Sequence, residues 1–408
     1  MMQFANGKRA LGFNSLGRTL PSHFTHPNAN WETRRTICAD YPNVSTIANP
    51  ALPQGSTVLV TGANGFLGAH IVDQFLRNGY RVRGTVRDPN KDRWLLEYFD
   101  QQYGNGSFEL VAVPDMQADG AYNQAVKDVS VFVHSAASVA FDNDPNKIIP
   151  VTVAGTVNAL KAAYSEPSVK RFVLTSSSAA AVGLLSSGVM VTEDTWNEEA
   201  VKDAWSGEPY PPNRSVIVYE ASKAQSEQAV WKYHEENRRQ RPDLTINAGR
   251  PSLVPLEAPF DTSKSITVLP NLIFGRPIDA VNQGRRTSAG FVAALWKGEE
   301  PSVHLGVPRQ YYVDVEDTAL LHVAGAVLPH VQSQRIFAFA GRFNWDTVLD
   351  EMRALDPKRK LTAHFSGGED PNEIVPRAKA EKLLRELGRP GWTSLKDTIA
   401  ATVKDIKV

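Results

Sequence analysis

The chain has 408 residues and carries 44 Lys or Arg against 44 Asp or Glu, so its formal net charge is zero. No excess of positive charge points to nucleic acid or an acidic surface as a partner. A hydrophobic content of 42% supports a sizeable core, and no apolar run approaches the roughly 18 residues of a membrane span. The single cysteine, Cys38, excludes an intramolecular disulfide and is typical of a reducing compartment. We therefore expect a cytoplasmic protein without nucleic-acid or membrane partners.

The first part of the chain, residues 1–50, differs from the rest in composition. It is rich in Asn, Pro, Ser and Thr, and shows no sustained helical or strand period. Three basic residues precede the first acid, Glu32, as in mitochondrial transit peptides, but prolines and glycines interrupt any amphipathic helix. We expect a disordered extension, with mitochondrial targeting as the alternative. His23 and His26 have no third ligand close in sequence, so no metal site is expected.

A strand, a glycine turn, a helix and a second strand follow this segment. The apolar run 58–60 predicts a buried parallel strand, and the next elements are a helix from about Phe66 to Arg77 and a strand over Arg81–Val86. Three glycines lie between the first strand and the helix at the spacing G-x-x-G-x-x-G: Gly62, Gly65 and Gly68. Such glycines allow a tight turn and a close approach to a pyrophosphate, which the helix N-terminus binds. The unit predicts a dinucleotide site; the alternative is a βαβ unit that binds no nucleotide.

The end of the second strand indicates which dinucleotide binds. NAD sites usually place an acid there for the ribose 2′-hydroxyl, whereas an arginine accommodates the 2′-phosphate of NADP. Arg87 follows the strand, Lys91 and Arg93 lie nearby, and Arg83 lies within it. These cations favour NADPH. Asp88 leaves NAD as an alternative cofactor. The cations could also be solvent-exposed residues at a strand end that bind no ligand.

Strand and helix patterns alternate along the chain beyond this unit. We expect further strands at 108–113, 129–134, 171–175 and 244–248, and helices over 122–127, 145–164 and 218–239. This alternation predicts an α/β protein with a doubly wound parallel sheet, the Rossmann fold. Ligands bind beyond the carboxyl ends of the strands in such folds.

The pattern loosens after residue 250, where Pro and Gly become frequent. We therefore divide the chain into a nucleotide-binding domain, 51–250, and a smaller C-terminal substrate-binding lobe. The lobe comprises 251–309 and 341–408, while 310–340 return to the nucleotide-binding domain.

A serine run and a Tyr-Lys pair provide the chemistry. The serines at 176–178 follow the fifth expected strand, and Tyr219 and Lys223 share one face of the long helix, a turn apart. Reducing a carbonyl requires a hydride from one side and a proton for the nascent alkoxide. Tyrosine is a weak acid with an ordinary pKa of about 10, so a lysine ammonium and the oxidised nicotinamide must stabilise its phenolate. A serine hydroxyl can donate to the substrate oxygen. Each element recurs by chance alone, but their combination predicts a reductase site.

The chain resembles the extended short-chain dehydrogenase/reductases, near the dihydroflavonol 4-reductase group and closer still to fungal NADPH-dependent aldehyde and carbonyl reductases. The likeness spans about residues 51–400. The stretches that carry it are LPQGSTVLVTGANGFLGAH, GYRVRGTVRD, VPDM, KRFVLTSSSAA, VYEASKAQSE, PRQYYVDVEDTALLH and LGRPGW.

The resemblance implies catalytic residues by position. Tyr219 and Lys223 match directly. The catalytic serine falls on Ser177, or on Ser178 if the loop is aligned from its far side.

The resemblance also implies the cofactor contacts. Arg87 takes the 2′-phosphate with Lys91 as a second contact, and Asp115 and Met116 lie against the adenine. The remaining contacts are Gly62, Asn64, Gly65, Phe66, Leu67, Gly68, Ala136, Tyr219, Lys223, Pro251 and Ser252. Ser252 departs from the asparagine that relatives often have after this proline, which affects hydrogen bonding beside the nicotinamide.

The expected function is NADPH-dependent reduction of an aldehyde or ketone to an alcohol, in fungal secondary metabolism or in detoxification. We expect a small-molecule carbonyl substrate, a monomer or homodimer, and no metal. An NAD-dependent epimerase or dehydratase of the same fold and a non-catalytic NADP-binding sensor remain alternatives. Five aromatic residues could line a substrate pocket or pack in the core: Trp196, Trp205, Phe260, Phe274 and Trp296.

Overall fold

A computed structural model describes most of the chain, and all of this part belongs to one compact unit, Val44–Val408. The expected extension up to residue 48, together with Phe260, Pro251 and Ser252, lies outside the described residues. The described ranges are 49–137, 141–207, 214–246, 266–285, 287–302, 304–332 and 334–407.

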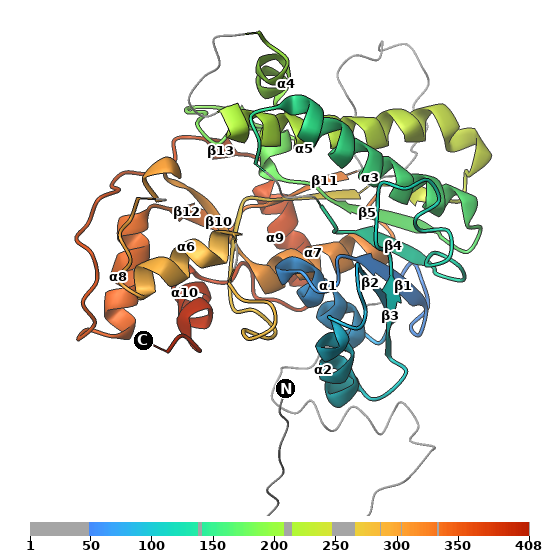
Figure 1. The fold of residues 1–408 in the computed structure, drawn as a ribbon, viewed down its shortest axis with the longest axis horizontal. Helices are drawn as coiled ribbons and strands as arrows, with labels where there is room; N and C mark the ends of the chain where they lie inside the picture. The colour runs from blue at the N-terminus through green and yellow to red at the C-terminus, as the bar shows by residue number, and fades with distance from the viewer. Residues whose placement is uncertain are drawn as a thin grey trace, which may run out of the picture. The chain divides into compact units, whose positions relative to one another are not determined.

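An eight-stranded sheet forms the centre of this unit (Figure 1). Its strands are β1 (Thr57–Thr61), β2 (Arg81–Val86), β3 (Phe108–Ala112), β4 (Val131–His134), β5 (Arg171–Thr175), β7 (Thr245–Ile246), β8 (Ile266–Pro270) and β11 (Gln334–Ala338). Their order is β11-β8-β5-β4-β1-β2-β3, with β7 also paired to β5, and every pair is parallel. The chain runs outward in opposite directions from β1 and β4, so the ligand crevice of such a fold lies at their carboxyl ends.

Helices cover both faces of the sheet, which explains why the middle residues of its central strands are apolar. On one face, α3 (Pro145–Ser165) and α4 (Glu198–Ala204) pack against α5 (Arg214–Asn237), and on the other, α1 (Phe66–Arg77) packs against α7 (Val315–Val327) (Figure 1). Val58, Leu59 and Val60 of β1 consequently have no exposed surface. The expected doubly wound parallel sheet is confirmed.

A second, three-stranded sheet lies outside the main one. It consists of β9 (Leu272–Phe274), β10 (Gln310–Asp314) and β12 (Gly341–Phe343), with β10 parallel to β9 and antiparallel to β12. The short strands β6 (Met190–Val191) and β13 (Glu373–Ile374) form a parallel pair. The remaining helices are α2 (Arg93–Tyr103), α6 (Thr287–Trp296), α8 (Trp345–Leu355), α9 (Arg377–Glu386) and α10 (Leu395–Val403).

Several sequence expectations about individual elements are wrong. The segment 122–127 forms turns instead of a helix, although its apolar members are buried. Helix α2 was not expected. β8 belongs to the main sheet although its residues were expected in the lobe. Of the segment 310–340, which was expected to return to the main sheet, β11 does join that sheet, whereas β10 belongs to the second sheet. A short apolar strand carries no information about which sheet it joins. The division into domain and lobe stays a prediction.

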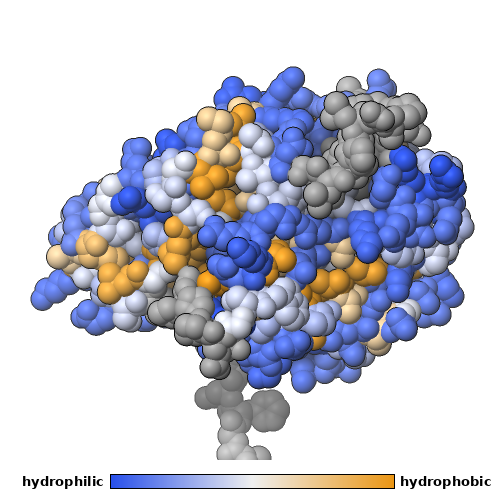
Figure 2. Space-filling model, turned by 90° about the horizontal axis from the view of Figure 1, so that it is seen from above, coloured by the Kyte–Doolittle hydropathy of each residue, from blue (hydrophilic) through white to orange (hydrophobic). Residues whose placement is uncertain are grey.

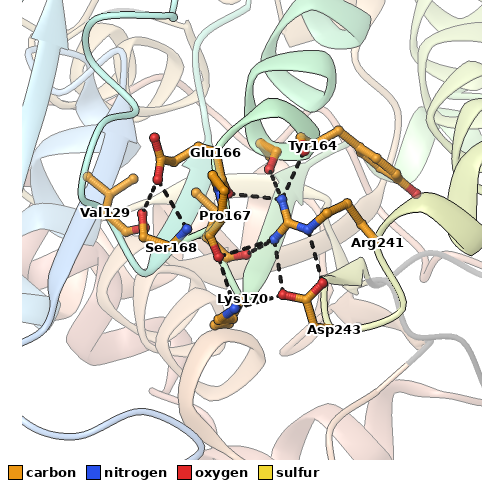
Figure 3. A network of polar contacts seen from close by, with 10 residues as sticks. Val129, Tyr164, Glu166, Pro167, Ser168, Lys170, Arg241 and Asp243 are labelled. Atoms are coloured by element: carbon orange, nitrogen blue, oxygen red, sulfur yellow. Dashed lines mark hydrogen bonds and ion pairs between the residues drawn. The ribbon is translucent and has the colours of Figure 1, made fainter.

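Arg241 fixes the connection between α3 and β5 (Figure 3). Its guanidinium donates to the carbonyl oxygens of Ala163 and Tyr164 in the last turn of α3, at 3.2 and 2.9 Å, and to that of Val169 at 2.7 Å. The carbonyls of Ala163 and Tyr164 lie at the C-terminal end of α3, which is the negative end of the helix dipole, so a cation there is favourable. Asp243 pairs with Arg241, whose hydrogen bonds lower the pKa of this carboxyl. The N-terminal end of β5 is thereby held in place.

The surface in Figure 2 is mainly hydrophilic, and its apolar residues form bands among hydrophilic areas. None of the helices in the described ranges is both long and apolar enough to cross a membrane. Most large apolar side chains are instead buried between the sheet and its helices.

Candidate active and cofactor site

The glycine turn after β1 has the close backbone packing that a dinucleotide cradle needs. Gly62 has a φ of +67°, a conformation that favours glycine. A Cβ at Gly68 would lie 2.1 Å from the carbonyl oxygen of Gly62, so only glycine fits where α1 meets the turn. Gly65 is the N-cap of α1, and no side chain caps this helix. The first amides of α1 are therefore available to a phosphate.

The carboxyl ends of β1 and β4 are tied together by Thr61, which the sequence analysis did not identify. Its Oγ1 accepts from the backbone N–H groups of Ser135 and Ala136, both at 3.0 Å, which leaves its hydrogen for His134 Nδ1 at 3.0 Å. A Cβ at Gly62 would lie 3.1 Å from Cα of Ala136. The structure thus places Ala136 directly beside the glycine turn.

A glutamine from the second part of the chain braces the turn. Gln283 Nε2 donates to the carbonyl oxygens of Asn64 and Gly65 at 3.3 and 3.0 Å. The side chain of Asn64 donates to Asp92 at 2.9 Å. Gln283 lies more than 200 residues from the turn in sequence, at a separation of 219 from Asn64, so no local pattern could have identified it.

Arg87, the residue expected to bind a 2′-phosphate, has a side chain without a partner in the described part of the chain. It is exposed at the end of β2 and has no hydrogen bond or ion pair with any described residue. Arg83, by contrast, is used structurally, because it pairs with Glu109 and donates to two backbone carbonyls. Lys91 lies 3.8 Å from Asp88 and is otherwise open to solvent.

The segment after β3 carries Asp115 and Met116 at the same edge of the sheet. Asn158 of α3 donates from Nδ2 to the carbonyl oxygens of Met116 and Gln117, at 3.3 and 2.7 Å. The Met116 side chain lies against Gly155, where a Cβ would be 3.3 Å from it. Asp115 is exposed. Both candidates therefore sit on a segment that α3 fixes.

The structure brings Ser177, Tyr219 and Lys223 together. The Tyr219 hydroxyl lies 3.5 Å from Ser177 Oγ, and Lys223 Nζ lies 5.9 Å from the centre of the Tyr219 ring. Lys223 is buried. The burial of His134, and then the positive charge of Lys223, lower the pKa of His134 to about 3. α5 begins at Arg214, four residues earlier than expected, so Tyr219 lies in its second turn and does not open it.

The three serines after β5 point to different partners. Ser176 Oγ donates to the buried carboxylate of Glu227 at 2.7 Å. Ser177 Oγ faces Tyr219 and accepts from the Ala179 N–H at 3.2 Å. Ser178 opens a 3₁₀ turn, Ser178–Ala180. The geometry therefore favours Ser177 over Ser178 as the serine of the site.

Two of the five aromatic pocket candidates are in the core. Phe274 and Trp296 are buried, and the ring of Trp196 lies 4.1 Å below the guanidinium of Arg335. Trp205 is 47% exposed and lines an open pocket of about 370 Å³ with Asp142. In the part of the chain that the structure covers, no cluster of three His, Cys, Asp or Glu side chains could hold a metal.

Fold, glycine cradle and side-chain constellation together define a nucleotide-dependent α/β enzyme family. Residues 58–324 match the NAD dependent epimerase/dehydratase family, and the chain belongs to this family. It is 38% identical to aldehyde reductase 2 of Sporidiobolus salmonicolor, over 87% of this chain and 97% of that protein. It is 37% identical to ketoreductase adrE of Penicillium rubens, over 85% and 95%.

The fold is similar to a solved reductase structure that contains NADPH. The yeast methylglyoxal/isovaleraldehyde reductase Gre2 complexed with NADPH matches with a TM-score of 0.68 and 26% identity, over 85% of this chain and 97% of that one. The family resemblance expected from the sequence is thus confirmed.

Proposed function

We propose that this protein is an NADPH-dependent carbonyl reductase that converts an aldehyde or ketone to an alcohol. The approach of the Tyr219 hydroxyl to Ser177 Oγ, at 3.5 Å with Lys223 one turn further along α5, carries this proposal. The relatives named aldehyde reductase and ketoreductase, each covered over almost its full length, support the same reaction class.

Each of the three side chains has a separate task in this mechanism. Ser177 Oγ accepts from the Ala179 N–H, so its own hydrogen is free to donate to the substrate carbonyl oxygen. Tyr219, whose hydroxyl lies beside Ser177 Oγ, donates the proton that the nascent alkoxide needs. The ammonium of Lys223 stabilises the phenolate left behind. NADPH supplies the hydride when it is bound.

The residues around the glycine turn fit a dinucleotide phosphate. The turn excludes a Cβ at Gly68, and the uncapped N-terminus of α1 offers its amides to the pyrophosphate. Arg87 offers an exposed guanidinium without a described partner for the 2′-phosphate, with Lys91 nearby. Asp115, Met116 and Ala136 belong to the proposed cofactor site, as do the following: Asn64, Gly65, Phe66, Leu67, Pro251 and Ser252.

The experiment is a comparison of Tyr219→Phe with the native enzyme and with Tyr233→Phe, a control on the same helix. NADPH oxidation is followed with aromatic aldehydes and β-keto esters. Loss of the proton donor should lower kcat by a factor of about 10²–10⁴, while the control keeps its activity. Undiminished turnover in Tyr219→Phe would contradict the role of Tyr219 as the proton donor. Tightly retained NAD without net NADPH oxidation would favour the epimerase or dehydratase alternative.

We also propose that the protein is cytoplasmic and that it is a monomer or a homodimer. Its chain would be divided into a nucleotide-binding domain and a substrate lobe. Light scattering of the purified full-length chain tests the oligomeric state, and a fluorescent C-terminal fusion tests the location.

A further inference from the structure

A buried carboxylate holds the residue that precedes Ser177. Ser176 Oγ donates to Glu227 Oε2 at 2.7 Å, and the Glu227 side chain has no exposed surface. Glu227 lies on α5 one turn beyond Lys223. The helix that carries Tyr219 and Lys223 is therefore also the helix that holds the serine loop.

Arg335 of β11 compensates the charge of this carboxylate. Its Nε lies 2.8 Å from Glu227 Oε1, and its side chain is also fully buried. Its Nη1 donates to the carbonyl oxygens of Glu193 and Thr195, and its guanidinium lies 4.1 Å from the Trp196 ring. Because its Nε and Nη1 donors are bonded and one face of the guanidinium lies against Trp196, Arg335 keeps Glu227 in one orientation.

A histidine, His322, binds Thr175, the residue that precedes Ser176. The Thr318 carbonyl oxygen can only accept, so His322 Nδ1 donates to it at 2.8 Å. His322 Nε2 is then the acceptor for the hydroxyl of Thr175, also at 2.8 Å. Burial lowers the pKa of His322 to about 4, which keeps this acceptor unprotonated near neutral pH. Thr175 and Ser176 are thus both fixed by side chains from distant parts of the chain.

Ser177 itself has no such buried partner. Its only described side-chain contacts are the Ala179 N–H and the Tyr219 hydroxyl. We infer that Glu227, oriented by Arg335, and His322 are positioning residues that set the distance between Ser177 and Tyr219. This inference rests on the proposed function, in which Ser177 donates to the substrate oxygen. Misplacing a reacting group by about 1 Å can cost about 100-fold in rate.

Ser176→Ala tests the inference without disturbing the ion pair, since it removes only the hydroxyl that binds Glu227. Ser168→Ala is the matched control. Ser168 Oγ also donates to a glutamate, Glu166, at 2.7 Å, but at the N-terminal end of β5 (Figure 3). For each variant we would measure kcat and KM for the carbonyl substrate, the Kd of NADPH, and Tm.

We expect Ser176→Ala to lower kcat about 10-fold to 100-fold, with an unchanged Kd of NADPH, and Ser168→Ala to leave kcat as it is. The decisive measurement repeats Ser176→Ala in a Ser177→Ala background. A residue that acts through Ser177 should then change kcat by less than about 2-fold, because coupled residues are not additive. Equal losses in both backgrounds, or no loss in either, would overturn the inference.

Thr175→Val provides the second variant should Ser176→Ala fold poorly. It removes the hydroxyl that binds His322, and Thr175→Ser should restore kcat because it returns that hydroxyl. Failure of Thr175→Ser to restore kcat, or an effect of Thr175→Val that persists in the Ser177→Ala background, would contradict the role of His322. Full activity in Ser177→Ala alone would instead overturn the proposed role of the serine, so the two failures are distinguishable.

Discussion

Arg335 and Glu227 form an ion pair in which neither side chain has any exposed surface, with Arg335 Nε 2.8 Å from Glu227 Oε1. The pair joins β11, at one edge of the main sheet, to α5, which covers its face. Two desolvated charges depend on each other: removing one leaves the other buried without compensation.

Arg335→Met should therefore lower the free energy of unfolding by about 3–5 kcal/mol. The double variant Arg335→Met/Glu227→Met should be more stable than the sum of the two single losses predicts, since it leaves no unpaired charge. Urea unfolding measures both. Arg93→Met breaks an exposed pair with Glu97 and should change stability by less than about 1 kcal/mol. Strictly additive losses in the double variant would contradict the coupling.

Gly68→Ala should weaken the binding of NADPH. The added Cβ would lie 2.1 Å from the Gly62 carbonyl oxygen, so the turn and α1 must move apart. We expect the Kd of NADPH to rise at least about 10-fold, as a lost or displaced phosphate contact implies. Fluorescence titration measures the change. Gly207→Ala is the control, because a Cβ there meets nothing within 4 Å. An unchanged Kd in Gly68→Ala would exclude this turn as the cradle.

Arg87→Ala should reduce the preference for NADPH over NADH about 10-fold to 100-fold, the effect of losing a hydrogen bond to a charged group. The reason is that only NADPH carries the 2′-phosphate that this guanidinium would bind. Steady-state kinetics with both cofactors measure the ratio of kcat/KM values. Arg93→Ala, whose side chain pairs with Glu97, should keep the ratio. Equal losses of kcat/KM with both cofactors would show that Arg87 does not bind the 2′-phosphate.

The sequence was sufficient for the features that depend on local pattern. The glycine spacing, the helix Phe66–Arg77 and the strands Arg81–Val86 and Arg171–Thr175 occur as expected, because turn residues and apolar periodicity act over a few neighbours. The four-residue spacing of Tyr219 and Lys223 likewise places both on one helix face.

Features that depend on tertiary contacts could not be predicted from the sequence. Nothing in the local sequence distinguishes Arg83, which pairs with Glu109, from Arg87, which has no described partner. Thr175 and His322 are 147 residues apart in sequence, and their hydrogen bond exists only because α7 packs on β5. The placement of β8 in the main sheet is similarly a matter of long-range pairing.

Asp314, the N-cap of α7, makes the stability of the fold dependent on pH. Burial, and then the charge of Asp317, raise the pKa of Asp314 from 3.8 to about 7. A carboxyl whose pKa is higher in the folded state stabilises the fold when protonated. Its contribution is complete below pH 3.8 and is lost as the pH rises through about 7.

Asp314→Asn should remove this dependence, since asparagine also caps helices and can bond to Thr398. The difference in unfolding free energy between the variant and the native protein should shift in favour of the variant as the pH rises from about 4 to about 7. Its upper bound is about 4 kcal/mol, from 1.36 kcal/mol per pKa unit. Urea unfolding at several pH values measures it. Asp144→Asn changes the partly exposed N-cap of α3 and serves as the control. A difference that stays constant with pH in Asp314→Asn would show that Asp314 is already ionised throughout this range in the folded protein.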